Sequence, residues 1–322
     1  MVDKIITHIL PEAQPRQLMF EQGKLDVIDI RGSFAAEVVQ DGHLIPKLQE
    51  KGVQLFSAPD LATELFGINN SLALFKDNVK LRQAMSMAFD RHRYNELLFR
   101  GVSTVAQSII PPGLAGYQED FINPYNVYDL VKAKQLLAEA GYPLGQGLPT
   151  ITLDIGPDTN ARHQGAFFKT CMERVGIKIQ VVTNIFPALM KKLDQKKTMV
   201  HTLSWVADYS DADTFLQTLY KGASRLGAYF NDDVYDALYE KATVMQPSAE
   251  RTALYRQLNH IVAECVPVLC TGHPVYRGLY QGWVKNYCWC NFIYNTEQYI
   301  DVDLAQKKLY RPSAKACLAS IL

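Results

Sequence analysis

The sequence has no excess of charge of either sign. Its 322 residues include 33 lysines and arginines and 33 aspartates and glutamates, so the formal net charge is zero. Binding of a nucleic-acid backbone requires a clustered basic surface. The densest basic run, KKLDQKK at 191–197, is predicted to be the solvated end of a helix. The charge balance therefore argues against nucleic acid as the main partner.

The sequence also lacks long apolar runs. No stretch reaches the ~18 apolar residues that indicate a transmembrane helix. The first ten residues, MVDKIITHIL, do not combine a basic segment, a long apolar segment and a small-residue cleavage site. No export signal is therefore predicted in this chain. Either the protein acts in the cytosol or its true start is missing.

Cysteine is scarce as well. Six cysteines are too few for a disulfide scaffold of this size, and their spacing matches no zinc-binding pattern. Buried thiols are the simplest interpretation. Cys288 and Cys290 would lie on one face of a strand, which could suit a metal, but no second pair of Cys or His residues accompanies them at ligand spacing. We therefore predict no metal site and no cofactor.

Apolar side chains, in contrast, are plentiful. Hydrophobic residues make up 48% of the chain, which is enough for sizeable cores. The length suggests two compact units.

The N-terminal residues alternate between strand-like and helix-like patterns. Residues 3–10 are apolar and β-branched, residues 11–24 begin with proline and stop at a glycine, and residues 25–30 alternate apolar and acidic side chains. This order predicts a β-α-β unit. A further strand is predicted at 53–59.

A strong helical pattern covers residues 77–101. Asp77 can cap its start and Gly101 can end it. Arg82 and the charges at 90–93 lie off its apolar stripe. The stripe consists of Val79, Leu81, Met85, Ala88 and Phe89.

The rest of the chain alternates helices with strands. Helices are predicted at 126–142, 161–176, 231–245 and 247–266, and strands at 150–156 and 177–183. An aromatic-rich, strand-like region follows at 275–294. Strands that alternate with helices indicate an α/β fold.

The segment SWVADYSDADTFL at 204–216 gathers Asp208, Asp211 and Asp213 among aromatic residues. Clustered aspartates are common in turns, so ordinary loop acids are one interpretation. A cation site is another, although the segment lacks the glycine and the later bidentate glutamate of a calcium loop. A ligand-binding role is the third.

Five segments occur in an order that resembles a known family. They are RQLMFEQGKLDVIDI, FGINNSLALFKDNVKLRQAMSMAFDRHRY, YDLVKAKQLLAEAGY, WVADYSDADTFL and YFNDDVYDALYEKATVMQPSAERTALYRQLNHIVAECVPVL. Each alone is a weak signal. Together they resemble the extracellular solute-binding proteins of family 5, the oligopeptide- and dipeptide-binding proteins of ABC importers. The resemblance covers roughly Ile5 to Leu304.

The resemblance implies an α/β fold of the periplasmic-binding-protein-like, two-lobe clamshell type (type II, cluster C like), with ligand enclosed between the lobes. The chain would begin partway through the family's pattern and hold one complete lobe plus the returning part of the other. We expect residues 1–68 to form part of the first lobe, 69–280 the second α/β lobe, and 281–322 the return to the first lobe and a tail. Hinge crossings would fall near 66–70 and 278–285.

The resemblance also assigns residues to the ligand. In peptide-binding relatives the aspartate of a W-x-x-D-Y motif contacts the peptide ammonium, and Asp208 matches it here. A carboxylate suits this role because charge-assisted hydrogen bonds are stronger than neutral ones. Trp205 would supply an apolar wall that tolerates a cation. Asp211 is expected to form a turn, and Ala212 departs from the family's usual proline.

Arg162 is the predicted partner of the peptide carboxylate, because arginine forms bidentate pairs and a helix N-terminus favours anions. A plain surface arginine is the alternative. Tyr229 and Phe230 are predicted to line the cleft, although such aromatics are often core residues. Asn69 is expected at the crossover, where backbone groups can pair with an extended peptide.

These expectations predict a solute-binding protein without catalytic residues. It would capture oligopeptides or dipeptides in the periplasm or at the cell surface and deliver them to ABC permease subunits, without nucleic acid and without spanning the membrane itself. The alternatives are another cargo (nickel, haem or sugar) or a truncated, non-functional fragment. A hydrolase with His201 as general base is a further alternative, but the sequence shows no nucleophile elbow, P-loop or His-Glu zinc motif.

Overall fold

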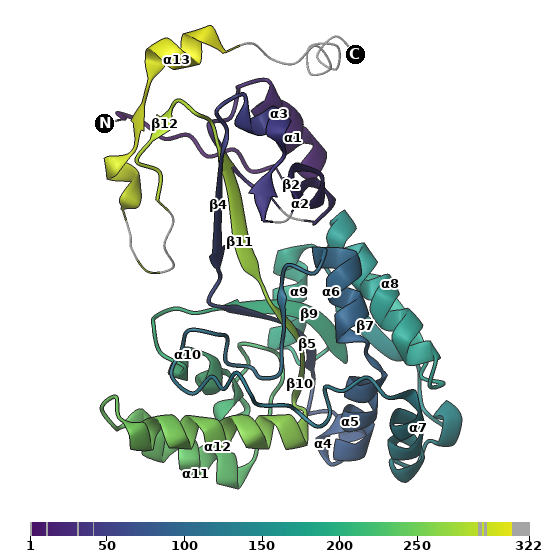
Figure 1. The fold of residues 1–322 in the computed structure, drawn as a ribbon. Coiled ribbons are helices and arrows are strands. Elements are labelled where there is room, and N and C mark those ends of the chain that lie inside the picture. The colour runs from purple at the N-terminus through teal and green to yellow at the C-terminus, as the bar shows by residue number, and fades with distance from the viewer. Residues whose placement is uncertain are drawn as a thin grey trace. The chain divides into compact units, whose positions relative to one another are not determined.

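The computed structural model describes residues 2–10, 12–30, 32–40, 42–288, 292 and 295–310 (Figure 1). The chain forms two compact units. Unit 1 contains residues 1–60 and 275–322, and unit 2 contains Leu61–Pro274. Each has helices and a β-sheet, so the predicted α/β class with two units is confirmed.

The chain passes between the units after Asp60 and again after Pro274. These positions lie a few residues before the expected ends of the segments at 68 and 280. The reason is that β5 (Ala62–Ile68) and β10 (Val268–His273) pair along their lengths within the sheet of unit 2.

Unit 1 is built on a three-stranded antiparallel sheet in the order β1-β11-β4. Its strands are β1 (Val27–Asp29), β4 (Gln54–Pro59) and β11 (Val275–Tyr280). The elements around the sheet are α1 (Ala13–Glu21), α2 (Gly32–Val38), α3 (Pro46–Gln49), β2 (Val39–Gln40) and β3 (His43–Leu44). Together they bury one small core: Phe20, Ile28, Ile30, Phe34, Val38, Val39, Leu44, Leu48, Val53 and Leu279.

The predicted first strand and the β-α-β unit are wrong. Residues 2–10 form neither helix nor strand, and Ile5, Ile6 and Ile9 are exposed. The central partner of β1 is β11, which comes about 250 residues later in the chain. An apolar run forms a strand only where a neighbouring strand accepts its backbone hydrogen bonds.

The last described residues belong to unit 1. They form β12 (Val284–Lys285), η3 (Thr296–Tyr299), β13 (Asp301–Val302) and α13 (Leu304–Leu309). Trp283 Nε1 and Lys307 Nζ each lie 2.7 Å from the Asp26 Oδ1 oxygen. Gln281 Nε2 donates a 2.7 Å hydrogen bond to the Phe20 carbonyl. These contacts hold residues 281–307 against residues 20–26 within unit 1.

Unit 2 contains a six-stranded mixed sheet in the order β6-β10-β5-β9-β7-β8. The remaining strands are β6 (Thr104–Val105), β7 (Ile151–Ile155), β8 (Ile179–Thr183) and β9 (Val200–Val206). β7 runs parallel to both β8 and β9, whereas β5 is antiparallel to β9 and β10. The β7-α8-β8 connection is a β-α-β unit, as the alternation at 150–183 predicts.

The helices of unit 2 cover both faces of this sheet (Figure 1). They are α4 (Ala73–Lys76), α5 (Val79–Ala88), α6 (Arg91–Phe99), α7 (Leu130–Glu139), α8 (Thr159–Glu173), α9 (Phe186–Asp194), α10 (Asp213–Leu216), α11 (Asp233–Thr243) and α12 (Ala249–Cys265). Two short 3-10 turns add η1 (Pro143–Gly145) and η2 (Gln217–Gly222).

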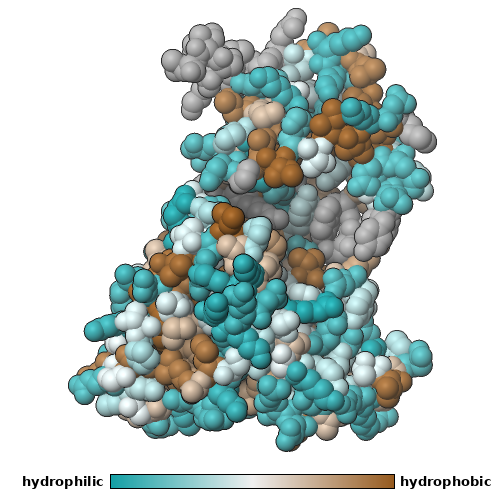
Figure 2. Space-filling view, turned by 180° about the vertical axis from the view of Figure 1, so that it is seen from behind, coloured by the Kyte–Doolittle hydropathy of each residue, from teal (hydrophilic) through white to brown (hydrophobic). Residues whose placement is uncertain are grey.

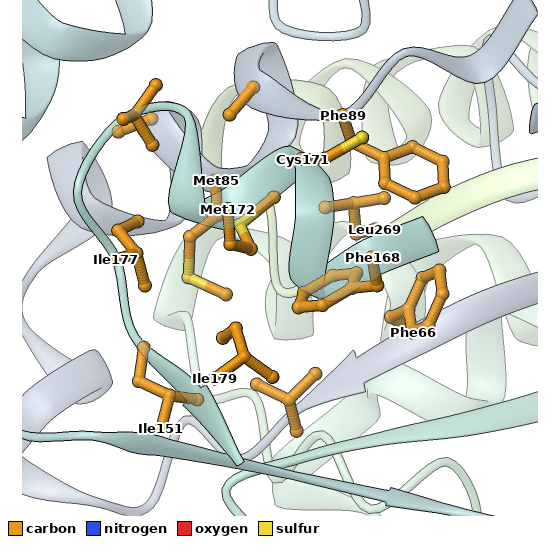
Figure 3. Packing of buried hydrophobic residues seen from close by; sticks show 14 of the residues in the cluster. Phe66, Met85, Phe89, Ile151, Phe168, Cys171, Met172, Ile177, Ile179 and Leu269 are labelled. Carbon is orange, nitrogen blue, oxygen red and sulfur yellow. The ribbon is translucent and has the colours of Figure 1, made fainter. Parts of the chain in front are cut away.

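Two hydrophobic cores lie on the two faces of the sheet. Adjacent residues of β5 divide between them: Phe66 belongs to one core and Leu65 to the other, as the period of two in a strand requires. Figure 3 shows the first core, where Phe168 of α8 lies over Phe66. Their ring centroids are 4.5 Å apart, and Phe89 lies 5.5 Å from Phe66. Each buried side chain of this size stabilises the fold by roughly 1.5–3 kcal/mol.

The pattern at 77–101 forms two helices rather than one. Asn78, not Asp77, caps α5 by accepting a 3.1 Å hydrogen bond from the Leu81 amide, and Asp90 caps α6 in the same way. The predicted apolar stripe is also too narrow, because every residue from Leu81 to Ala88 is buried. This helix therefore packs on several sides.

Arg91 is the largest fully buried side chain. Its Nε donates to the Cys270 carbonyl at 2.8 Å, and its terminal nitrogens donate to the carbonyl and hydroxyl oxygens of Ser86 at 3.0 and 2.8 Å. Burial lowers the pKa of Arg91 to about 9. The guanidinium satisfies carbonyl groups where α5 ends and connects this turn to β10.

Large apolar side chains on the surface are scattered. Figure 2 shows one face of the molecule, where hydrophilic residues predominate and apolar residues form separate patches. Exposed Val131 belongs to α7, and exposed Val234 and Val244 lie at opposite ends of α11. Across the described part of the chain, no helix has both the length and the apolar character needed to cross a bilayer.

Candidate ligand-binding site

Several loops of unit 2 meet at one edge of its sheet, which we call the strand-end edge. The parallel strands β7 and β9 both run toward this edge; Ile155, the last residue of β7, is level with Thr202, and β9 continues four residues further to Val206. Because β5 is antiparallel to β9 and pairs Ala62 with Val206, β5 begins at the same edge. Open α/β sheets bind ligands at the carboxyl ends of their strands. The predicted residues Asp208 and Arg162 both follow strands that end at this edge.

Asp208 lies in the loop after β9, and its side chain is 55% exposed. Its Oδ2 lies 3.8 Å from Arg225 Nη1, a loose ion pair in which both side chains are about half exposed. The Asp208 amide donates a 3.1 Å hydrogen bond to the Thr214 hydroxyl, which fixes the loop. This carboxylate is therefore positioned by its backbone and remains open to solvent.

Trp205 stands beside this carboxylate at the end of β9. The Arg225 guanidinium lies 5.8 Å from the centre of the indole ring, within cation-π range. The half-buried ring thus already carries a cation on its face, and that cation also contacts Asp208. An incoming ammonium group would compete with Arg225 for both partners. No pattern in the sequence around Arg225 indicated that this residue would contact Trp205 and Asp208.

The other two aspartates of the segment have structural partners. Asp211 accepts hydrogen bonds from the Asp213 amide at 2.9 Å and the Tyr255 hydroxyl at 2.8 Å, and it pairs with Arg251. Asp213 accepts a 2.5 Å hydrogen bond from Tyr209. Asp211 thus anchors the turn to α12, as a turn former would. No group of three metal-ligating side chains occurs among the residues that the structure describes.

Arg162 is exposed in the first turns of α8, whose N-cap is Asp158. Its guanidinium donates to the Pro157 carbonyl and, at 2.9 Å, to the Thr159 hydroxyl. These contacts fold the side chain back over the start of its own helix. Arg162 remains accessible to an anion, and the positive end of the helix adds to its attraction.

Asn69 is a correction to the predicted site. Its side chain is fully buried, donates to the carbonyls of Lys196 and Thr198 at 3.1 and 2.8 Å, and accepts from Ser71. The backbone amide of Asn69 donates a 3.0 Å hydrogen bond to the Met199 carbonyl. Every one of these groups already has a partner inside unit 2, so Asn69 organises the end of β5 and is not open to a ligand.

Tyr229 and Phe230 are also buried in unit 2, contrary to the prediction that they line a cleft. The Tyr229 hydroxyl donates to the Leu193 carbonyl, and Lys196 Nζ lies 4.9 Å from the ring centre. Phe230 packs edge-on against Tyr235, with ring centroids 5.7 Å apart. Both side chains are therefore core residues of unit 2, which was the alternative interpretation of their sequence.

His201 does not have the exposure of a general base. It is fully buried, and its Nε2 lies 2.8 Å from the Leu226 carbonyl oxygen. The ring occupies space that Gly67 leaves open, since a Cβ there would approach His201 Nε2 to 2.3 Å. Burial lowers the pKa of His201 to about 4.

Of the two cysteines that could lie on one strand face, Cys288 is exposed, whereas Cys290 lies outside the described residues.

A pocket that the sequence did not predict lies on unit 2, with a volume of about 220 Å³. Its lining comes from β5, β9 and β10, from the starts of α8 and α9, and from Tyr94 of α6. Asp158, which lines it, is the residue that caps α8. The one available signal is Glu64, an isolated acid within the apolar strand ATELFGI.

An open sheet that presents accessible charged side chains beside a pocket is typical of α/β proteins that bind small ligands. The sequence model of the bacterial extracellular solute-binding proteins, family 5 Middle, matches residues 1–226. The chain therefore belongs to this family of solute-binding proteins.

Two curated relatives show the extent of the likeness. The chain is 29% identical to heme-binding protein A of Haemophilus influenzae over 311 residues, which is 94% of this chain and 54% of the relative. It is 24% identical to the dipeptide-binding protein of Escherichia coli over 292 residues, or 89% of this chain and 52% of the relative. The chain thus spans about half the length of these relatives.

A solved structure shows the same fold. The periplasmic binding protein DppA from Helicobacter pylori, in complex with peptide STSA, superimposes with a TM-score of 0.79 at 22% identity. The match covers 91% of this chain and 56% of that one. The predicted family and fold class are confirmed.

Proposed function

We propose that this chain acts in a solute-binding component of an ABC importer that captures short peptides and delivers them to permease subunits in the membrane. The names of the dipeptide-binding relative and of the peptide-bound structure support a peptide cargo. The family's extracellular character supports a location in the periplasm or at the cell surface.

The observation that carries the proposal is the pair of opposite charges at the strand-end edge. Asp208 and Arg162 are both exposed and follow parallel strands of one sheet. A peptide is a zwitterion, with an ammonium group at one end and a carboxylate at the other. An exposed carboxylate and an exposed guanidinium at one edge provide partners for both ends. Among the residues that the structure describes, neither charge is locked into a short ion pair.

Isothermal titration with trialanine at concentrations up to the millimolar range tests this role. We expect Asp208→Asn to weaken binding by about 10- to 100-fold, because it removes the negative charge that strengthens the hydrogen bond to the ammonium group. N-acetyl-trialanine lacks the ammonium and should bind the wild type and the variant equally weakly. Asp120→Asn, which changes an exposed loop carboxylate of unit 2, serves as the control and should have no effect. Unchanged trialanine binding by Asp208→Asn would contradict the role.

Haem is a second candidate cargo, because the relative matched over most of this chain is named a heme-binding protein. A mixed ligand screen, in which the purified protein is analysed by mass spectrometry, distinguishes a peptide cargo from haem. Recovery of peptides supports the proposal. Recovery of haem without peptides would replace it.

A further inference from the structure

The turn that carries Arg225 is fixed to the core of unit 2. The Gly227 amide donates a 2.8 Å hydrogen bond to the Ser224 carbonyl, which closes a tight turn. Arg225 and Leu226 are the two central residues of this turn. The Leu226 side chain is fully buried, and its carbonyl oxygen lies 2.8 Å from Nε2 of His201 in β9. The backbone at Arg225 is thereby held in place, while the Arg225 side chain remains exposed.

The glycine at 227 is required by this packing. Gly227 has a φ of 61°, in the left-handed region that glycine adopts without strain. A Cβ at this position would approach the Leu193 side chain to 2.5 Å and the His201 ring to 2.7 Å. Both of those side chains are buried, so a larger residue would have to displace them. The position of Arg225 is therefore preorganised by the core, which lowers the cost of using it to bind a ligand.

Arg225 and Asp208 present opposite charges side by side. Arg225 Nη1 lies 3.8 Å from Asp208 Oδ2, and their side chains are 56% and 55% exposed. The guanidinium also lies 5.8 Å from the centre of the Trp205 ring. An ion pair of 3.8 Å is longer than a hydrogen bond, so it does not fix the N–H donors of the guanidinium. Arg225 can therefore donate to a ligand from its place beside Asp208.

Binding of an ammonium group at Asp208 changes the balance around Arg225. The other two aspartates of this loop, Asp211 and Asp213, have partners within unit 2. An ammonium group that takes the Asp208 carboxylate therefore leaves the guanidinium without its anion. It also places two positive charges close together, which is unfavourable. A ligand that brings a carboxylate next to its own ammonium restores the alternation of charge.

A peptide with an acidic first residue is such a ligand. Only a few bonds separate the α-ammonium of aspartate or glutamate from its side-chain carboxylate, so the two charges lie roughly 3–6 Å apart. This range includes the separation between Asp208 and Arg225. The ammonium can thus meet Asp208 while the side-chain carboxylate meets Arg225, whose planar guanidinium suits a carboxylate.

We propose that Arg225 is a specificity-determining residue, which makes the chain prefer peptides whose first residue is aspartate or glutamate. This inference rests on the proposed function, because it assumes that a peptide ammonium binds at Asp208.

Isothermal titration with Asp-Ala-Ala and Asn-Ala-Ala at low ionic strength tests it, since these peptides differ only in the charge of the first side chain. We expect the wild type to bind Asp-Ala-Ala about 3- to 10-fold more tightly, a modest factor because Arg225 is half exposed. Arg225→Gln should reduce this ratio to about one. Asn-Ala-Ala should bind this variant at least as tightly as the wild type, because a positive charge beside its ammonium is gone.

Two further variants serve as controls. Arg225→Lys keeps the charge and should keep most of the preference. Arg256→Gln makes the same change as Arg225→Gln at an exposed arginine of α12 and should preserve the ratio.

Three results would overturn the role of Arg225 and leave the proposed function intact. They are equal binding of Asp-Ala-Ala and Asn-Ala-Ala by the wild type, an unchanged ratio in Arg225→Gln, and loss of Asn-Ala-Ala binding in that variant, which would mean that Arg225 only shapes the loop. Absence of binding by any peptide, trialanine included, would overturn both.

Discussion

Units 1 and 2 belong to one chain but bury their apolar side chains differently. Unit 2 packs helices on both faces of a six-stranded sheet and has two hydrophobic cores. Unit 1 has a three-stranded sheet and one small core. β4 of unit 1 has no buried residue, whereas six of the seven residues of β5 in unit 2 are buried. Since stability follows the apolar area removed from water, we expect unit 2 to be the more stable.

The largest expected effect comes from removing a central core ring. Phe168→Ala should lower the free energy of unfolding of unit 2 by about 3–5 kcal/mol, because Phe168 is fully buried against Phe66 and Phe89 and its loss leaves a cavity. Phe20→Ala makes the same change in the smaller core of unit 1 and should cost less, because a small core relaxes around the gap more easily.

Denaturant-dependent hydrogen exchange measures both variants, since it follows each unit through its own strand amides. In the wild type, the amides of β5 and β9 should be better protected than those of β1 and β4. A larger loss of unfolding free energy in Phe20→Ala than in Phe168→Ala would contradict the expected difference between the units.

Acid should affect the two units unequally. His201 and His273 of unit 2 are buried, and burial lowers the pKa of each to about 4. The unfolded chain, with histidine pKa values near 6.5, therefore binds more protons than the folded state between pH 6.5 and 4. Stability must fall as the pH falls through this window, by on the order of 2 kcal/mol for each histidine at pH 5.

The two histidines of unit 1, His8 and His43, are exposed. Unit 1 should therefore lose less stability than unit 2 between pH 7 and 5, as read from the exchange of its strand amides. His273→Asn keeps a group that can bond the Thr63 hydroxyl, now 3.1 Å from Nδ1, and should remove about half of the pH dependence of unit 2. Equal pH dependence in both units would show that these buried rings are not its source.

The smallest effect concerns a helix cap. Asp129 accepts 2.9 Å hydrogen bonds from the Val131 and Lys132 amides at the start of α7. Asp129→Ala should destabilise unit 2 by about 1 kcal/mol, and Asp129→Ser should restore most of the loss. Thermal unfolding and the exchange of α7 amides report the change. An equal loss in Asp129→Ser would indicate that the cap does not act through these hydrogen bonds.

Local patterns predicted the elements whose signals are complete within a short window. The pattern at 126–142 contains both the capping aspartate and the apolar face of α7, and the pattern at 161–176 contains most of α8. The prediction failed where a partner lies far away. Residues 3–10 have a strand-like composition but no strand pairs with them, and the helical pattern at 77–101 is divided at a junction that Arg91 ties to β10.

The candidate site shows the same contrast between what a local pattern predicts and what distant segments decide. The W-x-x-D-Y motif identified Asp208, and the predicted helix start identified Arg162; the structure leaves both residues accessible. In contrast, Asn69, Tyr229 and Phe230 are enclosed. Composition could not separate these cases. An aromatic ring or an amide serves equally well in a core and in a binding site, and burial depends on which distant segments cover it.

By itself, the sequence determined the family, the α/β class and the position of most helices, because these follow from ordered motifs and from periodicity within short windows. Only the tertiary structure decided that Arg91 lies inside, that Arg225 stands beside Asp208, and that Glu64 lines a pocket with residues from β9 and α8. The physical reason is that charge, burial and hydrogen bonding act through space. The environment of a side chain is therefore set by segments that can be far apart in the chain.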